Sequence, residues 1–173
     1  MILAMKPKYE NDRPTFYFKE DSNRPIRAGG VLFYRRDKNR TNVLMIKNRG
    51  RYEDFGGRTD AIDTSIEDTI AREVEEESNG IFNSVEIKSY LKDKNTISIH
   101  NSKYLLYFVE LDKYYDPELF GDKEIHDNIN RTVEWVSYDK LTNKDFINNF
   151  LHYRLKNKNF FDGLKRCIPQ FVN

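Results

Sequence analysis

Residues Gly56–Ile81 read GGRTDAIDTSIEDTIAREVEEESNGI, and this stretch decides the fold. Three of its apolar residues, Ile66, Ile70 and Val74, are four positions apart, a spacing that places them on one face of a helix. The stretch therefore predicts an amphipathic helix over residues 65–78, which packs that face against a hydrophobic core and leaves its charged residues on the open side.

Both ends of this predicted helix carry residues that favour starting or ending a helix. Thr64, followed three positions later by Glu67, fits a capping box, in which two side chains bond the free N–H groups of the first turn. Gly80 is suited to end the helix in a left-handed turn because it has no Cβ.

The residues around this helix alternate between apolar runs and turn-forming stretches. Strands are predicted over residues 31–34, 43–46, 85–91, 103–111 and 132–138. Further helices are predicted over residues 142–155, burying Phe146, Ile147, Phe150 and Leu151, and over residues 160–168. Strands mixed with a few helices indicate a sheet covered by helices, in an α/β or α+β sandwich.

The length of 173 residues fits one compact domain. Residues 28–173 are expected to form it, and residues 1–27, with their short aromatic run at 16–18, form an N-terminal extension that adds an edge strand. No apolar run is long enough to cross a bilayer, and the first residues do not form a signal peptide. Because the single cysteine, Cys167, cannot form an internal disulfide, a reducing, cytoplasmic location is expected.

Charge is unevenly distributed along the chain although the net charge is only +1. Residues 51–138 hold twenty of the 28 acidic residues, whereas residues 1–50 and 139–173 are basic on balance. This distribution suits a site that binds both cations and a polyanion.

The second half of the predicted helix gathers carboxylates. Glu73 and Glu77 are one turn apart on the same face, and Glu76 lies beside both. Like charges this close repel each other by roughly 0.2–0.5 kcal/mol per pair, so a sequence that keeps them together indicates a bound cation. Ligands that are all oxygen suit Mg²⁺ or Mn²⁺. A glutamate-rich helix alone is more often a solvated surface, but here the cap, the apolar stripe and the neighbouring glycines coincide with it.

Two neighbouring features fit the same site. Arg72 precedes Glu76 by one turn and can hold a carboxylate in place through a forked hydrogen bond. The pair Gly56-Gly57 lets the backbone approach a metal ion or a phosphate closely, because no Cβ intervenes.

Together these residues resemble the signature of the Nudix hydrolases, which is Gly, five residues, Glu, seven residues, Arg-Glu-aliphatic-any-Glu-Glu-any-Gly-aliphatic. The matching residues, in a box covering 57–81, are Gly57, Arg72, Glu73, Val74, Glu76, Glu77, Gly80 and Ile81. The resemblance implies an α/β/α sandwich with a mixed sheet. It also implies that Glu73, Glu76 and Glu77 act in catalysis and bind the metal with the Gly57 carbonyl, and that Arg72 orients them by a salt bridge.

The chain departs from that signature at three points. Asp63 stands where the family has a glutamate, and eight residues instead of seven separate it from Arg72. One extra residue, Ser78 or Asn79, precedes Gly80. Both insertions fall at helix ends, where a loop can absorb them, so the metal site is expected to be intact while a role for Asp63 is in doubt.

The resemblance further implies attack of water on phosphorus in a nucleoside diphosphate linked to another group, such as a free nucleotide, a dinucleotide or a nucleotide sugar. In the family, the general base is a glutamate of the box or one from a distant loop. The polar loop at residues 112–131 offers Glu118 and Glu124, and Glu124 is included among the catalytic candidates. An exposed acid of a loop is the plainer interpretation of both.

Substrate contacts are expected from residues just before or within the box. Arg49, Arg51 and Arg58 are candidate phosphate contacts and Tyr52 is a candidate for stacking a base, although surface solubility explains the cations equally well. The three histidines, His100, His126 and His152, show no metal-ligand spacing, and Cys167 is expected to serve in packing.

Two alternatives remain open. Some Nudix enzymes, including ones from large DNA viruses, hydrolyse the 5′ cap of RNA, and the cations at residues 154–166 would suit capped RNA as a partner. A Nudix fold that binds nucleotides without turnover is the other alternative, and the intact carboxylates weigh against it. The sequence does not determine the oligomeric state, and a homodimer is compatible with it.

Overall fold

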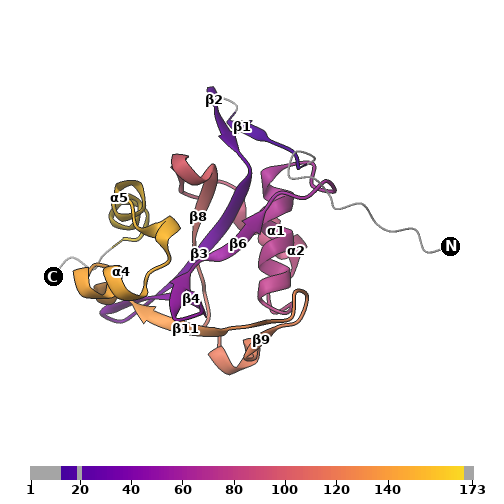
Figure 1. The fold of residues 1–173 in the computed structure, drawn as a ribbon. Coiled ribbons are helices and arrows are strands. Elements are labelled where there is room, and N and C mark those ends of the chain that lie inside the picture. Colours follow the sequence, from indigo (N-terminus) through magenta and orange to yellow (C-terminus); the bar gives the residue numbers. More distant parts are fainter. Residues whose placement is uncertain (1–12, 19–20, 170–173) are drawn as a thin grey trace.

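The computed structural model describes residues 13–18 and 21–169 of the chain. A mixed sheet of seven strands runs through the middle of the molecule, with helices on both of its faces (Figure 1). One face is covered by α1 (Ile66–Glu77) and α2 (Ser84–Leu91), and the other by α3 (Tyr138–Leu141), α4 (Lys144–Phe150) and α5 (Lys158–Cys167). The predicted α/β/α sandwich with a mixed sheet is therefore confirmed.

The middle strand of the main sheet, β3, has both parallel and antiparallel neighbours. Its strands are β3 (Ala28–Asp37), β4 (Arg40–Asn48), β5 (Arg51–Glu53), β6 (Phe55–Arg58), β7 (Thr96–Ile99), β8 (Tyr104–Glu110) and β11 (Thr132–Ser137). Five of them follow the order β11-β4-β3-β8-β7, while β5 pairs with β4 and β6 with β3. The β3–β8 pair is parallel and the other pairs are antiparallel.

Alternation along the strands separates the core into two clusters. On β3, Val31 and Phe33 belong to the cluster under α1 and α2, whereas Leu32 and Tyr34 belong to the cluster under the C-terminal helices. Successive strand residues point to opposite faces of a sheet, so a strand that is buried on both sides is apolar throughout.

The predicted helix over residues 65–78 is α1, but its first cap lies one residue later than expected. The Ser65 hydroxyl, not that of Thr64, accepts the N–H of Asp68 at 3.1 Å. Thr64 donates its own N–H to the Asp68 carboxylate at 3.1 Å. At the other end, Gly80 has a φ of +77° and donates its N–H to Glu75 at 2.8 Å, as predicted.

The N-terminal extension does not supply an edge strand to the main sheet, so that expectation is wrong for the described residues. β1 (Phe16–Phe18) pairs only with β2 (Asp21–Ile26), and the two form a hairpin that projects from the sheet (Figure 1). The N-terminal half of β3 is already flanked by β6 and β8, which leaves no free side there. Residues 1–12 lie outside the described part of the chain.

The prediction of a strand over residues 85–91 is also wrong, because this segment forms α2. Asn83 caps the helix by accepting the N–H groups of Val85 and Glu86 at 2.8 and 3.4 Å. Ile87 and Leu91, four positions apart, are both buried, so the helical spacing decides over the alternation.

The single helix predicted over residues 142–155 is interrupted. α4 ends at Phe150, which is 46% exposed, and a short 3-10 helix, η4 (Tyr153–Leu155), follows. Between them, Leu151 is extended and forms an isolated bridge with Tyr52. The helix predicted near residues 160–168 is present as α5. Among the described residues, no helix is long and apolar enough to span a membrane.

Candidate active site

The glycine pair of β6, Gly56 and Gly57, packs directly against α1. Gly56 and Gly57 pair with Gly30 and Gly29 of β3. A Cβ on Gly57 would lie 2.2 Å from a carboxylate oxygen of Glu73, and a Cβ on Gly56 would lie 2.3 Å from the Gly29 carbonyl. Only glycine fits at either position, so the strand backbone and the acidic side chains of the helix share one small space.

Two glutamates of α1 lie at this glycine pair. Glu77 accepts the N–H of Gly56 at 2.6 Å, and Glu73 lies against Gly57. Glu76 is half-buried beside them. Burial raises the pKa of Glu73 and of Glu76, with Arg72 partly offsetting the effect, and raises that of Glu77 well above its ordinary range.

Arg72 links these carboxylates to the loop before the helix. Its guanidinium donates to Glu73 at 2.7 Å, to Glu76 at 3.4 Å and to the Arg58 carbonyl at 2.9 Å. It also donates two bonds to Asp63, at 3.1 and 3.0 Å. Four groups thus accept hydrogen bonds from the Arg72 guanidinium and hold it in one position, which is the geometry that an orienting residue needs.

The Asp63 carboxylate is buried and accepts several hydrogen bonds. Its side chain is 2% exposed and accepts the Asp60 N–H at 2.7 Å and the Thr69 hydroxyl at 2.8 Å, besides Arg72. Burial raises the pKa of Asp63, but the bonds from Arg72, Asp60 and Thr69 outweigh it and leave the pKa below its ordinary value. The shorter aspartate therefore anchors Arg72 in this chain.

A polar network lies next to the glycine pair of β6. Asp54, fully buried, accepts the Tyr104 hydroxyl at 2.5 Å and the Arg154 guanidinium at 2.7 Å. Arg154 also lies 4.3 Å from the centre of the Tyr104 ring and 3.8 Å from Glu53. Burial raises the pKa of Glu53 to about 7 against the opposing charge of Arg154. This network joins the C-terminal region to the strand that carries Gly56.

A second acidic group approaches α1 from the loop at residues 112–131. That loop contains the 3-10 helix η3 (Pro117–Phe120) and a small hairpin of β9 (Lys123–Glu124) and β10 (Ile129–Asn130). Glu124 is only 5% exposed, unlike the exposed Glu118. Glu118 is therefore an exposed acid of the loop, as the plainer interpretation has it, whereas Glu124 is buried and does not fit that interpretation.

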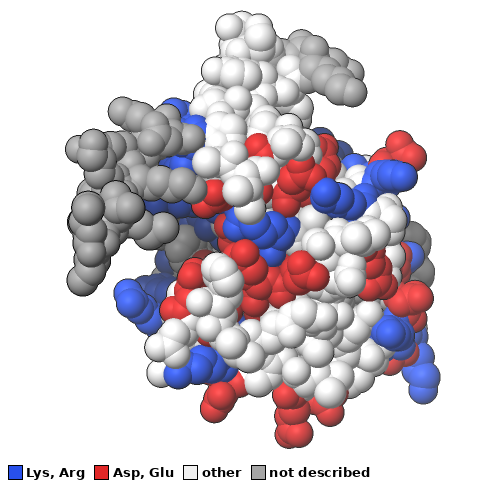
Figure 2. Space-filling view, turned by 90° about the vertical axis from the view of Figure 1, so that its right-hand side faces the viewer, with Lys and Arg blue, Asp and Glu red and all other residues white. Residues whose placement is uncertain are grey.

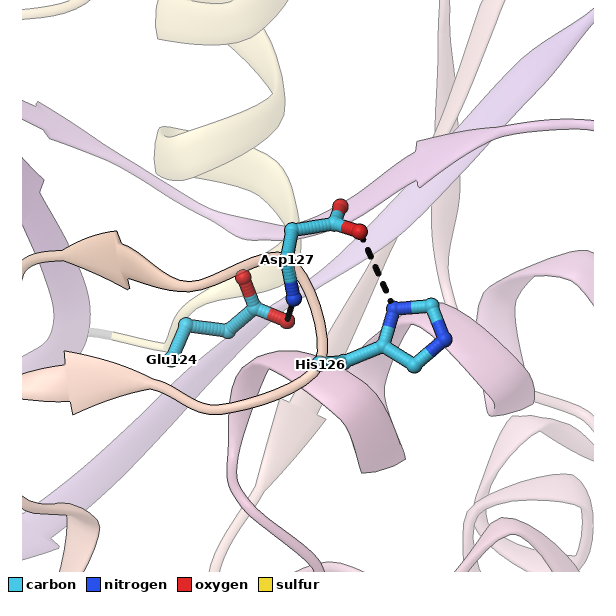
Figure 3. A group of neighbouring side chains, drawn as sticks. All are labelled: Glu124, His126 and Asp127. Carbon is cyan, nitrogen blue, oxygen red and sulfur yellow. Dashed lines mark hydrogen bonds and ion pairs between the residues drawn. The ribbon is translucent and has the colours of Figure 1, made fainter.

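The hairpin also brings His126 to the helix, which the sequence did not indicate. Figure 3 shows Glu124, His126 and Asp127 around the hairpin turn, with Asp127 donating its N–H to Glu124 at 3.2 Å. The His126 Nδ1 lies 3.2 Å from Asp127 and 3.6 Å from Glu76. No spacing in the sequence links residue 126 to residue 76, so only the fold reveals this contact.

The donors at this site fit a hard divalent cation. Figure 2, which faces the side of α1 and α2, shows acidic atoms gathered around basic ones near the middle of that face. Within the site, the carboxylates of Glu73, Glu76, Glu77 and Glu124 outnumber the guanidinium groups of Arg72 and Arg131, and burial penalises the charge of the three helical glutamates. A cation held by Glu73, Glu76, Glu77 and the backbone at Gly57 would offset that penalty.

The predicted substrate contacts are not all near this site. Tyr52 is buried in the cluster on the opposite face and donates to Glu134 at 2.5 Å, and Arg51 donates to the carbonyls of Asn148 and Asn149. Arg49 lies exposed in the turn between β4 and β5. Arg58 is exposed, and of these four residues it is the one whose backbone carbonyl accepts a bond from Arg72 of the acidic helix. Cys167 is buried, as expected for packing.

A sequence model of the NUDIX domain matches residues 24–156, which is more than half of the chain, and the chain therefore belongs to the Nudix family. A comparison with curated proteins found no match.

Solved structures resemble the chain at low sequence identity. The NUDIX domain of Shewanella oneidensis NrtR complexed with ADP ribose is 12% identical, with a TM-score of 0.46 over 68% of this chain and 75% of that one. A C. elegans Ap4A hydrolase is 15% identical, with a TM-score of 0.42 over 72% and 85%. A bifunctional NMN adenylyltransferase/ADP ribose pyrophosphatase of Francisella tularensis, complexed with AMP and a Mn ion, is 16% identical, with a TM-score of 0.46 over 79% and 41%.

Proposed function

We propose that the chain uses Mg²⁺ or Mn²⁺ to hydrolyse a diphosphate linkage in a nucleoside diphosphate joined to another group. The observation that carries the proposal is that Glu73 and Glu77 of α1 lie against the glycine pair of β6, in a space that admits no Cβ, with Glu76 half-buried on the same helix. Carboxylates that are this buried are costly without a cation near them.

Each residue of the site has a part in this proposal. Glu73, Glu76, Glu77 and the Gly57 carbonyl would hold the cation, which would neutralise phosphate oxygens and acidify a bound water. Arg72 holds Glu73 and Glu76 in fixed rotamers through bonds of 2.7 and 3.4 Å. Glu124, brought in by the hairpin, is the proposed acceptor of the proton of the attacking water.

A small nucleotide derivative is favoured as the substrate over capped RNA. Arg58, which is exposed and whose backbone carbonyl accepts a bond from Arg72, is the proposed phosphate contact. Among the C-terminal cations that would suit RNA, Arg154 is mostly buried in its pair with Asp54. Three others are at the surface, and each bonds an acceptor of the chain: Lys156 the Asn148 carbonyl, Lys158 the Asp162 carboxylate and Arg166 the Thr96 carbonyl. A phosphate chain would have to displace these bonds before the cations could contribute to salt-dependent binding.

The proposal is tested by measuring product formation from free nucleotides, nucleotide sugars, ADP-ribose and Ap4A, with Mg²⁺, with Mn²⁺ and with EDTA. Glu76→Gln is expected to lower kcat by more than the roughly 10–100-fold typical of groups that only support a ligand. Glu75→Gln is the matched control, because Glu75 lies on the same helix but its carboxylate accepts the Ser84 N–H of α2.

Two results would contradict the proposal. One is turnover that continues in EDTA, and the other is turnover in Glu76→Gln equal to that in Glu75→Gln. If binding of nucleotides persists with no turnover of any substrate in the wild type, the chain is a binding module instead. Capped RNA, assayed at two salt concentrations, belongs in the same panel, and its turnover in preference to free dinucleotides would replace the substrate class proposed here.

A further inference from the structure

The extra residue before Gly80 gives the C-terminal end of α1 an unusual shape. The helix closes with Ser78, and then Asn79 and Gly80 are both left-handed, with φ of +54° and +77°. Asn79 donates its backbone N–H to the Glu76 carbonyl at 3.1 Å. Asparagine tolerates this conformation better than most residues, and here it directs its side chain away from the helix.

The Asn79 side chain is bonded entirely to the hairpin loop. Its amide nitrogen donates to the carbonyls of Phe120 and Lys123 at 2.9 and 2.7 Å. Its amide oxygen accepts the N–H of Ile125 at 2.9 Å. Lys123 and Ile125 flank Glu124, so a single amide fixes the backbone on both sides of that glutamate.

Arg131 fastens the same loop from its other end. This buried arginine donates to the carbonyls of Phe120 and Gly121 at 2.9 and 2.7 Å, and to the Glu77 carbonyl at 2.6 Å. The loop between residues 120 and 131 is therefore attached twice to the C-terminal end of α1, close to Glu76 and Glu77.

We propose that Asn79 is a positioning residue, which holds Glu124 at the metal-binding face of α1 and thereby couples the hairpin to the reaction. The proposal rests on the proposed function, because it gives Glu124 a part in turnover. It also gives a function to the departure from the family spacing, because the extra residue directs a side-chain amide at the hairpin loop. A helix cap alone would not need three bonds to a segment more than forty residues away.

Asn79→Gly is the informative variant, because glycine adopts a positive φ readily and the substitution removes only the amide. The matched control is Asn128→Gly, on the turn of the same hairpin. Asn128 is exposed, has a φ of +59°, and its amide makes no hydrogen bond within the described residues. Both variants are compared with Glu124→Gln and with the double variant Asn79→Gly, Glu124→Gln.

We expect Asn79→Gly to lower kcat by roughly 10–100-fold with little change in KM, as for groups that hold a reacting residue in place. In the Glu124→Gln background it should have almost no further effect, because the two residues act as one unit. Hydrogen exchange gives a second readout that does not depend on turnover. The Ile125 N–H, which bonds only Asn79, should exchange faster in Asn79→Gly and unchanged in Asn128→Gly.

The proposal is overturned if Asn79→Gly behaves like Asn128→Gly, if its effect on kcat multiplies with that of Glu124→Gln, or if Glu124→Gln itself retains wild-type turnover. Should Asn79→Gly fail to fold, Arg131→Lys weakens the second attachment and is expected to show the same dependence on Glu124. The Glu76→Gln result judges the proposed function separately, since a loss there with no effect at Asn79 defeats only the positioning role.

Discussion

Among single residues, Asp63 gives the most direct prediction about the stability of the fold. It is 2% exposed and holds the Arg72 guanidinium through two bonds. Asp63→Asn removes the charge that accepts two bonds from Arg72, while Glu73 and Glu76 still pair with the guanidinium, and we expect the free energy of unfolding to fall by about 1.5–3 kcal/mol. Urea denaturation at pH 7 measures this. Asp162→Asn, which breaks an ion pair with Lys158 on the surface, should leave stability unchanged and serves as the control.

The same substitution predicts a change in acid sensitivity. Because the pKa of Asp63 is lowered on folding, its contribution is present above the unfolded value of about 3.9 and is lost as the pH falls through the lower folded value. The wild type should therefore lose more stability than Asp63→Asn between pH 5 and pH 2. Equal losses would show that Asp63 is not held by Arg72.

Much of the site at this scale could be predicted from the sequence, but not all of it. Arg72, Glu73, Glu76 and Glu77 fall within six consecutive positions of one helix, so their spacing alone brings them near one another. Asn79 and His126 were missed, because their partners are 41 or more residues away and in part are backbone groups that leave no mark on the sequence.

For the elements, the start of α1 provides a direct test. Ser65 is the N-cap, and Ser65→Ala removes the acceptor for the Asp68 N–H. The expected loss is about 1 kcal/mol, equivalent to a decrease in Tm of roughly 2–4 °C for a chain of this size. Calorimetry or thermal circular dichroism measures it.

The control for that test is the same substitution inside a helix. Ser89 lies exposed within α2, where alanine favours the helix, so Ser89→Ala should leave the Tm unchanged or raise it. A decrease in Ser89→Ala as large as that in Ser65→Ala would mean that capping is not the cause.

Element prediction succeeded where one pattern was present and failed where two overlapped. The stripe of Ile66, Ile70 and Val74 has only a helical interpretation, and α1 was predicted nearly to its ends. Residues 85–91 satisfy both alternation and a four-residue repeat, and the Asn83 cap decided for the helix. Residues 142–155 were split because Leu151 pairs with Tyr52, a long-range contact that local patterns do not reveal.

Across the whole molecule, the Arg154–Asp54 pair joins the C-terminal region to the sheet. Asp54 is fully buried, and Arg154 is the cation that neutralises it. Arg154→Met should destabilise the fold by about 3–5 kcal/mol, because an unpaired charge would remain inside. Lys156→Met, which removes a neighbouring cation at the surface, should have little effect, and adding Asp54→Asn to Arg154→Met should recover part of the loss. Unfolding in urea distinguishes the three variants.

The sandwich as a whole was predictable because both faces of its strands are apolar. The order of the strands was not, since the parallel pairing of β3 with β8 joins residues more than seventy positions apart. That pairing arises from packing of the entire chain, for which no local signal exists.

The bond between Asp54 and Arg154 also orders events during synthesis. The two residues are 100 positions apart, so at usual rates of translation the ribosome adds the arginine about 5–20 s after the aspartate. Until then, a nascent chain that buried Asp54 would do so without its countercharge. The glycine pair that follows it is thus expected to become rigid only when most of the polypeptide has left the exit tunnel, and binding of the proposed cation should be a late event.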